Sequence, residues 1–575
     1  MYQYITSRVR RFASLASDDV VQLVAPHQED IRMKRPLSMF MSNMLLASVI
    51  LSACATPTPQ VVTVKETVVV EGTPQVIEKV VTPTPEPSAP TAGGEVKIGW
   101  DEEISTLDPQ KHVGISNFSA MINVQEPLIF RDRNSVIQPL LATSWKRLDD
   151  VTWEFELRKG VSFHNGEPFN AEAVKFTFDR LLDPATESPQ SFLWAPSDLS
   201  GGLEKVELVD EYTVRFITSG PFGALLATLP LAFIMPPEAG ARDDYNTLGY
   251  GTGPFKVVEF DSQKGLLLEA NPDYWGGAPK LSQISFIPLS ETATRLSALR
   301  AGDVDIINAP PVEEVAALQG NGFKVIDTES NDTLVLAVGR GPAKQNVQPW
   351  TNPKLVEAVT YAIDRNVLVD SLFAGVQARP ATSVLSPGIF GYCRQPSIPR
   401  DLEKAKAALL EAGVEAGLKA NIVVPDGVRP KSVEVAQALV AQLADIGIEA
   451  QVVPMEPSSA WPVLNSSDFD FFLDGWGTMT MDADFNLFKN FHISGNREGT
   501  DIPELNELVA AARASSNDGE REDLYCQAQQ MIWNGVSRRI PLYHLVDIYA
   551  YNARVEGWEP RHDKLMLMHD VSVAE

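Results

Sequence analysis

The chain has 575 residues, of which 44% are hydrophobic and 21% are charged, a balance typical of a globular protein with several cores. Its formal net charge is −27 at pH 7, and because an acidic surface repels phosphate backbones, this charge argues against nucleic acid as a partner. Three cysteines exclude a disulfide-rich scaffold but leave open whether Cys393 and Cys526 form a bond or remain two separate buried thiols.

The first feature along the chain is an apolar stretch over residues 37–51, with Lys34 and Arg35 before it and small residues after it. A basic segment, an apolar segment and small residues before a cleavage point predict a secretory signal. The stretch is too short, and too often interrupted by polar side chains, for a helix that spans a membrane. We therefore expect residues 33–53 to be a signal peptide.

The signal ends in Leu-Ser-Ala followed by Cys54, and this motif resembles the lipobox of bacterial lipoproteins. The resemblance implies that Cys54 becomes the first residue of the mature protein and carries lipid. The protein would then be extracytoplasmic, in a periplasm or on the outer face of the plasma membrane, and anchored there by lipid. Residues 1–32 include acidic side chains, which do not suit a signal, so we interpret them as a mis-called start before Met33.

Residues 54–93 alternate prolines with threonines and valines and cannot build a core, so they predict a tether. Two valine-rich pieces, residues 61–70 and 76–81, have the composition of strands. They could form a short ribbon or a contact between copies of the chain. Because prolines bracket both pieces, we expect an extended linker instead.

From residue 94 onward, the sequence alternates helical and strand patterns, which predicts an α/β fold. Asn170 is expected to cap one helix, and Gly413 and Gly447 are expected to end two others. The predicted strands are 95–100, 151–157 and 448–453, and the predicted helices are 171–182, 402–412 and 432–446.

Six short motifs follow one another through this part, at residues 125–145, 157–171, 251–256, 271–277, 301–306 and 361–365. The second contains Leu-Arg-Lys-Gly-Val-Ser-Phe-His-Asn-Gly, the third is Gly-Thr-Gly-Pro-Phe-Lys, and the fourth is Asn-Pro-Asp-Tyr-Trp-Gly-Gly. Together and in this order they resemble the solute-binding proteins of ABC importers, family 5. That family includes the dipeptide-, oligopeptide-, glutathione- and nickel-binding proteins.

The resemblance implies a two-lobed periplasmic-binding-protein fold of type II, with an extra subdomain, mixed sheets and a cleft that closes like a hinge. Lobe I would comprise residues 94–330 and 541–575, with a subdomain inserted at about 135–220, and lobe II residues 331–540. A peptide-like or other small solute would bind between the lobes and pass to an ABC permease with its ATPase. We expect a monomer without a cofactor.

Residues 474–484 place a Gly-Trp pair before an acidic stretch, which resembles the cleft segment of the family's peptide binders. In those proteins an aspartate three residues after the tryptophan holds the α-ammonium group of the peptide, and Met479 occupies that position here. Asp482 and Asp484 follow in an arrangement that resembles the glutathione-binding subgroup. Asp482 could receive a ligand amine or cap a helix that begins near Phe485, and we expect Asp484 to cap that helix.

Other candidates for ligand contact lie on either side of this motif. Trp476 could offer an aromatic wall, because such clefts are largely apolar. Arg429, in a loop before a helix, could pair with a ligand carboxylate or be solvated. Asn117 and Phe118 lie in a region that borders the cleft in the family. The candidate ligand residues are therefore Asn117, Phe118, Arg429, Trp476, Thr478, Met479, Asp482 and Asp484.

Nothing in the sequence predicts catalysis, because it has no nucleophile elbow and its seven histidines are not spaced as metal ligands. His164 is expected to be structural and hydrogen-bonded to nearby backbone. We therefore predict no enzyme and no metal site. Two alternatives remain, a sensor or receptor lipoprotein that reuses the fold and a binder of oligosaccharides or metal complexes.

Overall fold

The computed structural model describes residues 62–70, 73–81, 93–194, 201–340, 349–414, 417–492 and 502–574. The chain separates into two units, residues 1–86 and residues 87–575. The predicted start at Met33, the signal peptide and the lipid anchor at Cys54 lie outside the described residues.

The first unit contains a hairpin of two antiparallel strands, β1 (Val62–Val70) and β2 (Thr73–Val81). The expectation of an extended linker is therefore wrong for these residues, and the ribbon alternative is the one that the structure contains. Valine, isoleucine and threonine favour extended, paired backbone, and this preference outweighs the effect of the nearby prolines.

The second unit is built on a mixed sheet of eleven strands, which confirms the predicted fold class. Strand β3 runs parallel to β12 and β13, and β16 runs parallel to β17 and β18, whereas the other neighbours are antiparallel. The order across the sheet is β10 (Phe255–Asp261), β11 (Gly265–Ala270), β12 (Gln283–Pro288), β3 (Glu95–Trp100), β13 (Ile306–Asn308), β19 (Arg539–Tyr551), β14 (Lys324–Val338), β18 (Phe471–Gly477), β16 (Leu418–Pro425) and β17 (Ile448–Met455), and β15 (Ala378–Pro380) pairs with β19.

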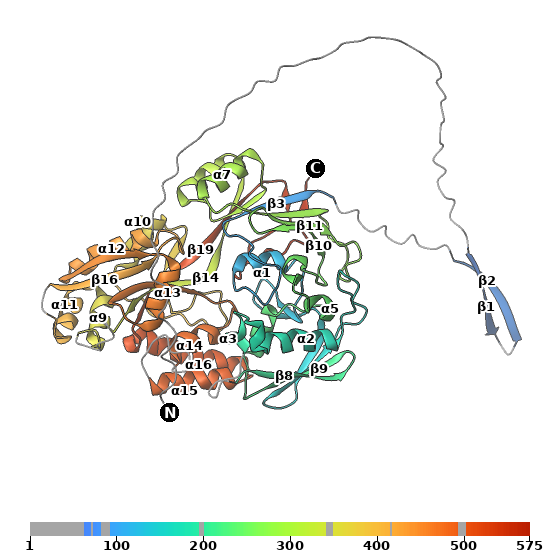
Figure 1. Cartoon of the computed structure of the whole chain (residues 1–575), viewed down its shortest axis with the longest axis horizontal. Coiled ribbons are helices and arrows are strands. Elements are labelled where there is room, and N and C mark those ends of the chain that lie inside the picture. Colours follow the sequence, from blue (N-terminus) through green and yellow to red (C-terminus); the bar gives the residue numbers. More distant parts are fainter. Residues whose placement is uncertain are drawn as a thin grey trace, which may run out of the picture. The chain divides into compact units, whose positions relative to one another are not determined.

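The two long strands β14 and β19 cross the middle of this unit (Figure 1). Their antiparallel pairing is interrupted between Glu329 and Thr333, where the register shifts. Residues 330–332 therefore leave the regular ladder at the centre of the sheet. The backbone there can aim side chains in directions that an unbroken strand would not allow.

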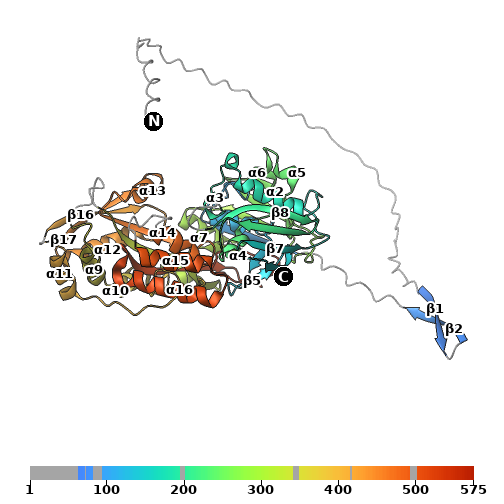
Figure 2. The same cartoon turned by 90° about the horizontal axis from the view of Figure 1, so that it is seen from below.

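Two large groups of buried side chains lie in different parts of the unit. The first core draws on residues 96–306 and 549–571, and the second core on residues 334–545. Figure 2 shows the corresponding two masses side by side, one around β7 and β8 and the other around β16 and β17. This distribution agrees with the proposed lobes I and II, whose boundaries remain predictions.

The first core includes a separate antiparallel sheet of four strands against which helix α2 (Ala171–Leu182) packs. The side chain of Asn170 caps α2 by accepting hydrogen bonds from the backbone of Glu172 and Ala173, at 3.0 and 3.2 Å. The predicted cap and helix are therefore confirmed. The strands are, in order, β6 (Ala142–Arg147), β7 (Thr152–Leu157), β9 (Thr213–Thr218) and β8 (Leu203–Asp210).

Two other predicted helices are also present, as α11 (Leu402–Glu411) and α12 (Ser432–Ala444). The chain leaves them through Gly413 and Gly447, whose φ angles are +76° and +85°. This left-handed conformation costs glycine least, which explains why the two helices end there. The other helices of the second half are α9 (Pro353–Ala362), α10 (Arg365–Phe373), α13 (Pro457–Ser466), α14 (Ala483–Phe491), α15 (Pro503–Ala514) and α16 (Asp518–Met531).

The first half contains further short elements around the sheets. His164 in the loop after β7 makes a 2.9 Å hydrogen bond to the carbonyl oxygen of Gly253, which confirms its predicted structural role. The other α-helices and strands of this half are α1 (Ile115–Met121), β4 (Ile129–Arg131), β5 (Ile137–Pro139), α3 (Ser191–Trp194), α4 (Leu225–Thr228), α5 (Pro237–Gly240), α6 (Tyr245–Leu248), α7 (Thr292–Ala301) and α8 (Val315–Gly320). Near the C-terminus, β20 (Val555–Glu556) pairs with β21 (Ser572–Val573).

A disulfide joins Cys393 to Cys526 in α16, with the two Cα atoms 5.1 Å apart and the two cysteines 133 positions apart in sequence. Of the two alternatives left open by the sequence, the bonded pair is therefore the one present. A disulfide is typical of an oxidising, extracytoplasmic compartment. No helix in the described ranges is long and apolar enough to cross a membrane.

Candidate ligand-binding site

A cavity of about 370 Å³ lies beside the interruption in β14. One wall comes from the ends of β3 and β13, from α1 and from residues 561–567, which belong with the first core. The opposite wall comes from residues 428–430 and the end of β18, in the part that holds the second core. Residues 331–332 of β14 and 545–549 of β19 connect the two walls.

The wall at β18 is shaped by two glycines on either side of Trp476. Side chains alternate across a strand, so Gly475 and Gly477 face one way and Trp476 faces the other. A Cβ atom at Gly475 would lie 2.6 Å from Nε of Arg429, and one at Gly477 would lie 3.2 Å from Oδ1 of Asp332. The absence of side chains at both positions therefore makes room for a charged pair at the cavity wall.

Asp332 holds the central charge of the cavity. Its carboxylate accepts hydrogen bonds from Nη2 of Arg429 at 3.2 Å and from Nζ of Lys564 at 2.7 Å. Burial alone would raise the pKa of Asp332, but the Lys564 ammonium and the Arg429 guanidinium hold it well below its usual range. Asp332 thus remains ionised and connects a residue of one wall to a residue of the other.

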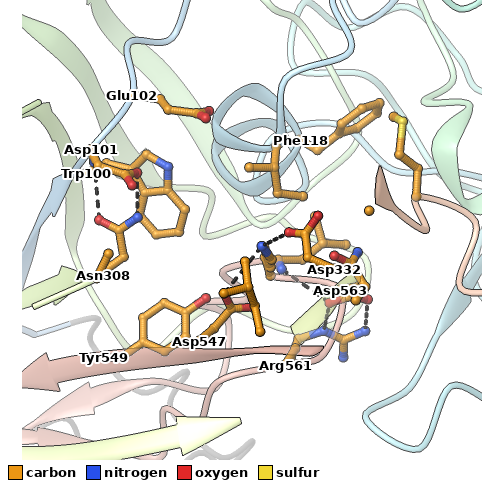
Figure 3. A pocket seen from close by; sticks show the side chains of 18 of the residues that line it. Trp100, Asp101, Glu102, Phe118, Asn308, Asp332, Asp547, Tyr549, Arg561 and Asp563 are labelled. Atoms are coloured by element: carbon orange, nitrogen blue, oxygen red, sulfur yellow. Dashed lines mark hydrogen bonds and ion pairs between the residues drawn. The ribbon is translucent and has the colours of Figure 1, made fainter. Parts of the chain in front are cut away.

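The same lysine extends the network to Asp547 of β19, and Figure 3 shows Asp332 and Asp547 on the same side of the cavity. Nζ of Lys564 lies 3.3 Å from the Asp547 carboxylate, whose other oxygen, Oδ2, is buried without a hydrogen-bond partner. Burial raises the pKa of Asp547, whereas the carboxylates of Asp332 and Asp547 raise the pKa of Lys564 against the opposing effect of burial. Arg561 and Asp563 form a neighbouring pair at 2.6 Å.

Apolar side chains line the rest of the cavity. They include Ile115 and Phe118 of α1, Leu231 from the first core and Met479 just after β18. The arrangement suits a small molecule that combines charged groups with an apolar portion, because such cavities bind through apolar contact and a few placed polar groups. Among the described residues, no group of three metal-ligating side chains is present.

Three of the eight predicted ligand residues line this cavity: Phe118, Arg429 and Met479. Asn117 does not; its buried side chain donates to the carbonyl oxygen of Thr106 at 2.7 Å and so holds the segment before α1. Thr478 does not either; its hydroxyl accepts a hydrogen bond from Asn486 at 2.5 Å and ties the end of β18 to α14.

Trp476 lies behind the cavity wall. Its side chain is 5% exposed, meets the ring of Phe491 edge-on at 5.6 Å and donates to the carbonyl oxygen of Val384 at 3.3 Å. The alternation of side chains along β18 places it there. Its present contacts are those of a core residue.

The two aspartates of the acidic stretch are paired inside the protein. Asp482 is the N-cap of α14 and accepts from the backbone of Asp484 at 3.0 Å, so helix capping is what the structure shows for Asp482. Its carboxylate also accepts from Nη2 of Arg521 at 2.8 Å. The expectation that Asp484 caps this helix is wrong, because the helix begins at Ala483 and the Asp484 carboxylate accepts from Arg513 instead.

The charged lining residues other than Arg429 were not predicted. Asp332, Asp547, Asp563 and Lys564 lie at a strand interruption, in a strand and in the C-terminal segment, and none belongs to a recognisable motif. Only the topology of the sheet brings these segments together. Asp547 is the one of these residues that the sequence marks, as a charge within the apolar run of residues 545–549.

Comparisons with known proteins agree with this arrangement. Residues 136–498 match the model of the bacterial extracellular solute-binding proteins, family 5 Middle. Di/tripeptide-binding protein 2 of Pseudomonas aeruginosa is 29% identical over 465 residues, 75% of this chain and 85% of that protein. Glutathione-binding protein GsiB of Escherichia coli is 28% identical over 484 residues, 81% of this chain and 92% of that protein.

Two solved structures share the fold. HbpA2 of Haemophilus parasuis has a TM-score of 0.74 and 25% identity, covering 84% of this chain and 100% of that one. The periplasmic binding protein DppA of Helicobacter pylori, in complex with the peptide STSA, has a TM-score of 0.71 and 24% identity, covering 84% of this chain and 98% of that one.

Replacement of Asp332 by asparagine should destabilise the protein. The change leaves the largely buried cations of Arg429 and Lys564 short of a partner, and we expect a loss of about 3 kcal/mol in the free energy of unfolding at pH 7. Because the pKa of Asp332 is lower in the folded than in the unfolded protein, its contribution is present at neutral pH and is lost as the pH falls below about 4. Urea unfolding at pH 7 and pH 3 should therefore show a smaller difference between Asp332→Asn and wild type at pH 3.

Asp327→Asn is the matched control, because Asp327 is an exposed carboxylate of the same strand, 3.9 Å from Arg379. We expect it to change the free energy of unfolding by less than about 0.5 kcal/mol. Equal losses in the two variants would contradict a special role for Asp332.

Proposed function

We propose that this chain, which belongs to the bacterial extracellular solute-binding proteins of family 5, is the lipid-anchored receptor of an ABC importer. It is a binding protein rather than an enzyme. It would capture a peptide-like solute between its two lobes and deliver the solute to a membrane permease with its ATPase. The observation that carries the proposal is the cavity, whose walls come from both cores and meet at the interruption in β14.

The chemistry of the cavity supports a peptide-like solute. A short peptide carries an ammonium group, a carboxylate and apolar side chains, and the cavity offers charged groups of both signs beside an apolar wall. The named relatives include a di/tripeptide-binding protein and a glutathione-binding protein. A sugar would instead call for neutral hydrogen-bonding groups, which are fewer in this lining.

Arg429 is the proposed partner of the solute's carboxylate. It faces the cavity, and its Nε atom is buried without an acceptor while Nη2 donates to Asp332. A planar guanidinium suits bidentate pairing with a carboxylate, and an unsatisfied buried donor gains most from a new acceptor. We propose that Phe118 and Met479 contact the apolar part of the solute, and that the other predicted residues support the walls.

Contacts between the two parts of the unit support hinge closure. The backbone of Gly223 donates to the carbonyl oxygen of Arg513 at 2.8 Å, and the Arg513 guanidinium lies 4.5 Å from the ring centre of Phe222 and 4.3 Å from that of Phe488. A side chain at residue 223 could not be accommodated, since its Cβ would lie 1.6 Å from the carbonyl oxygen of Ser515. The solute would favour this closed form by touching both walls at once.

The lipid anchor at Cys54 is proposed on the resemblance of its motif to a lipobox. A lipid at this position would keep the receptor close to its permease and raise their effective concentration. We expect Cys54→Ala to move the protein from the membrane fraction to the soluble fraction of cells, measured by immunoblotting. Unchanged membrane association would contradict the anchor.

Thermal unfolding in the presence of candidate solutes tests the function. Because a ligand that binds only the folded state stabilises it by mass action, we expect dipeptides and tripeptides to raise the melting temperature. The panel should also contain glutathione, opines, oligosaccharides and metal complexes. If a sugar or a metal complex raised the melting temperature and neither a peptide nor glutathione did, the assignment of a peptide-like solute would be overturned.

The contact of Arg429 with the solute can be tested apart from its contacts within the protein by comparing two solutes that differ only in the C-terminal carboxylate. We expect wild type to bind a dipeptide about 10- to 100-fold more tightly than its C-terminal amide, and Arg429→Met to bind both about equally. Trp476→Phe should keep the wild-type ratio, because Trp476 lies behind the wall. Titration calorimetry measures these ratios, and a wild-type ratio preserved in Arg429→Met would remove Arg429 from the site.

A further inference from the structure

The carboxylates that line the cavity outnumber the cations by one, five against four. A solute with a positive group can balance this excess of negative charge. The carboxylates are those of Asp101, Glu102, Asp332, Asp547 and Asp563, and the cations are those of Arg131, Arg429, Arg561 and Lys564.

The excess charge can be assigned to one pair of residues. Three of the cations pair with the aspartates of β14, β19 and position 563, and the fourth, Arg131, donates to the carbonyl oxygen of Ala227. Asp101 and Glu102 make no ion pair within the part of the chain that the structure describes. The Asp101 carboxylate accepts a neutral hydrogen bond from the Asn308 amide at 2.5 Å, and its charge raises the pKa of the Arg295 guanidinium against the larger, opposing effect of burial.

The position of this pair is set by the sheet. Asp101 and Glu102 are the first two residues after β3, and Asn308 is the last residue of its parallel neighbour β13. The carboxyl ends of parallel strands open into the crevice where α/β folds bind their ligands. The two carboxylates are therefore held at the cavity by regular structure.

The indole of Trp100 is a second, independent feature of this end of the cavity. It lines the cavity and is 4% exposed, yet its indole Nε1 is buried without a hydrogen-bond acceptor. Figure 3 shows the nitrogen of the Trp100 ring turned toward the side of the cavity where Glu102 lies. A buried donor without a partner is costly, and a solute with an acceptor at this place would remove the cost.

The surroundings of Glu102 also favour an incoming cation. Partial burial, followed by the charge of Asp101, raises the pKa of Glu102. Lys564 acts on Glu102 from a distance, but its ammonium group is already engaged with Asp332 and Asp547. A positive group placed between the two carboxylates would relieve their mutual repulsion.

We propose that Asp101 and Glu102 form the cation subsite of the cavity, where a primary ammonium group of the solute binds while the Trp100 indole donates to the solute's adjacent carbonyl oxygen. The proposal rests on the proposed function and assigns the solute's orientation. The ammonium end lies at the end of β3, and the carboxylate end lies at Arg429 on the opposite wall.

The subsite also predicts a preference among peptide-like solutes. A dipeptide is a zwitterion without net charge, whereas glutathione carries one more carboxylate than ammonium group. Because the lining already holds an excess of carboxylates, an additional negative charge on the solute meets repulsion. We expect glutathione to bind at least 10-fold more weakly than leucyl-phenylalanine.

The experiment compares leucyl-phenylalanine, or the dipeptide of largest thermal shift, with its N-acetyl derivative by titration calorimetry. N-acetylation replaces the ammonium group with a neutral acetamide and leaves the carboxylate end of the peptide unchanged. We expect it to weaken binding to wild type by about 100-fold, to Glu102→Gln by about 10-fold, and to the double variant Asp101→Asn/Glu102→Gln by less than 3-fold. Glu103→Gln is the matched control, because Glu103 is the exposed next residue and does not line the cavity.

The outcomes separate this proposal from the function on which it rests. An N-acetyl penalty that is the same in the double variant and in wild type, or absent from wild type, would overturn the cation subsite while leaving peptide binding intact. Dipeptide binding that requires added Ca²⁺ or Mg²⁺ would overturn it in favour of a metal at the carboxylates. If no peptide bound to the wild-type protein, both the proposed function and the cation subsite would be overturned. Melting temperatures of the variants show whether each has folded.

Discussion

The ion pairs of Asp332 connect the parts of this protein on which binding depends. The aspartate lies in the interruption between the two paired halves of β14 and β19. It holds Arg429 from one wall at 3.2 Å and Lys564 from the other at 2.7 Å. Because the pKa of Asp332 stays well below its usual range, this link persists throughout the neutral range of pH. The interruption of the central strands therefore determines where the charged residues of the cavity meet.

Much of the fold follows from local sequence patterns. The helix after Asn170 and the helices that end before Gly413 and Gly447 were predicted because caps and left-handed turns depend on single residue types. The hairpin of β1 and β2 was not expected, since the composition of strands competed with the presence of prolines. Composition alone does not show which of two opposed preferences prevails.

The site was predictable in part, and the reason lies in strand geometry. Gly477 and Met479 of the motif around Trp476 line the cavity, but the side chains of a strand alternate, so the flanking glycines face the cavity wall and the tryptophan faces the core. Asp482 is neutralised by Arg521, which lies 39 residues further along the chain in α16. A pattern within one segment cannot reveal a partner from another, and Asp101, Asp547 and Lys564 likewise meet only in the folded protein.

The balance of charge explains why the two ends of a solute would have to bind on different walls. Asp332 remains ionised and occupied by Lys564, so a carboxylate that pairs with Arg429 adds negative charge to a network that is neutral without it. That addition is tolerable in a cavity of this size only if the same solute brings a positive group. The place left for the positive group is the end of β3, where two carboxylates line the cavity without an ion pair to any residue that the structure describes. A zwitterion that spans the cavity would thus touch both walls, and this requirement for two contacts couples its recognition to closure.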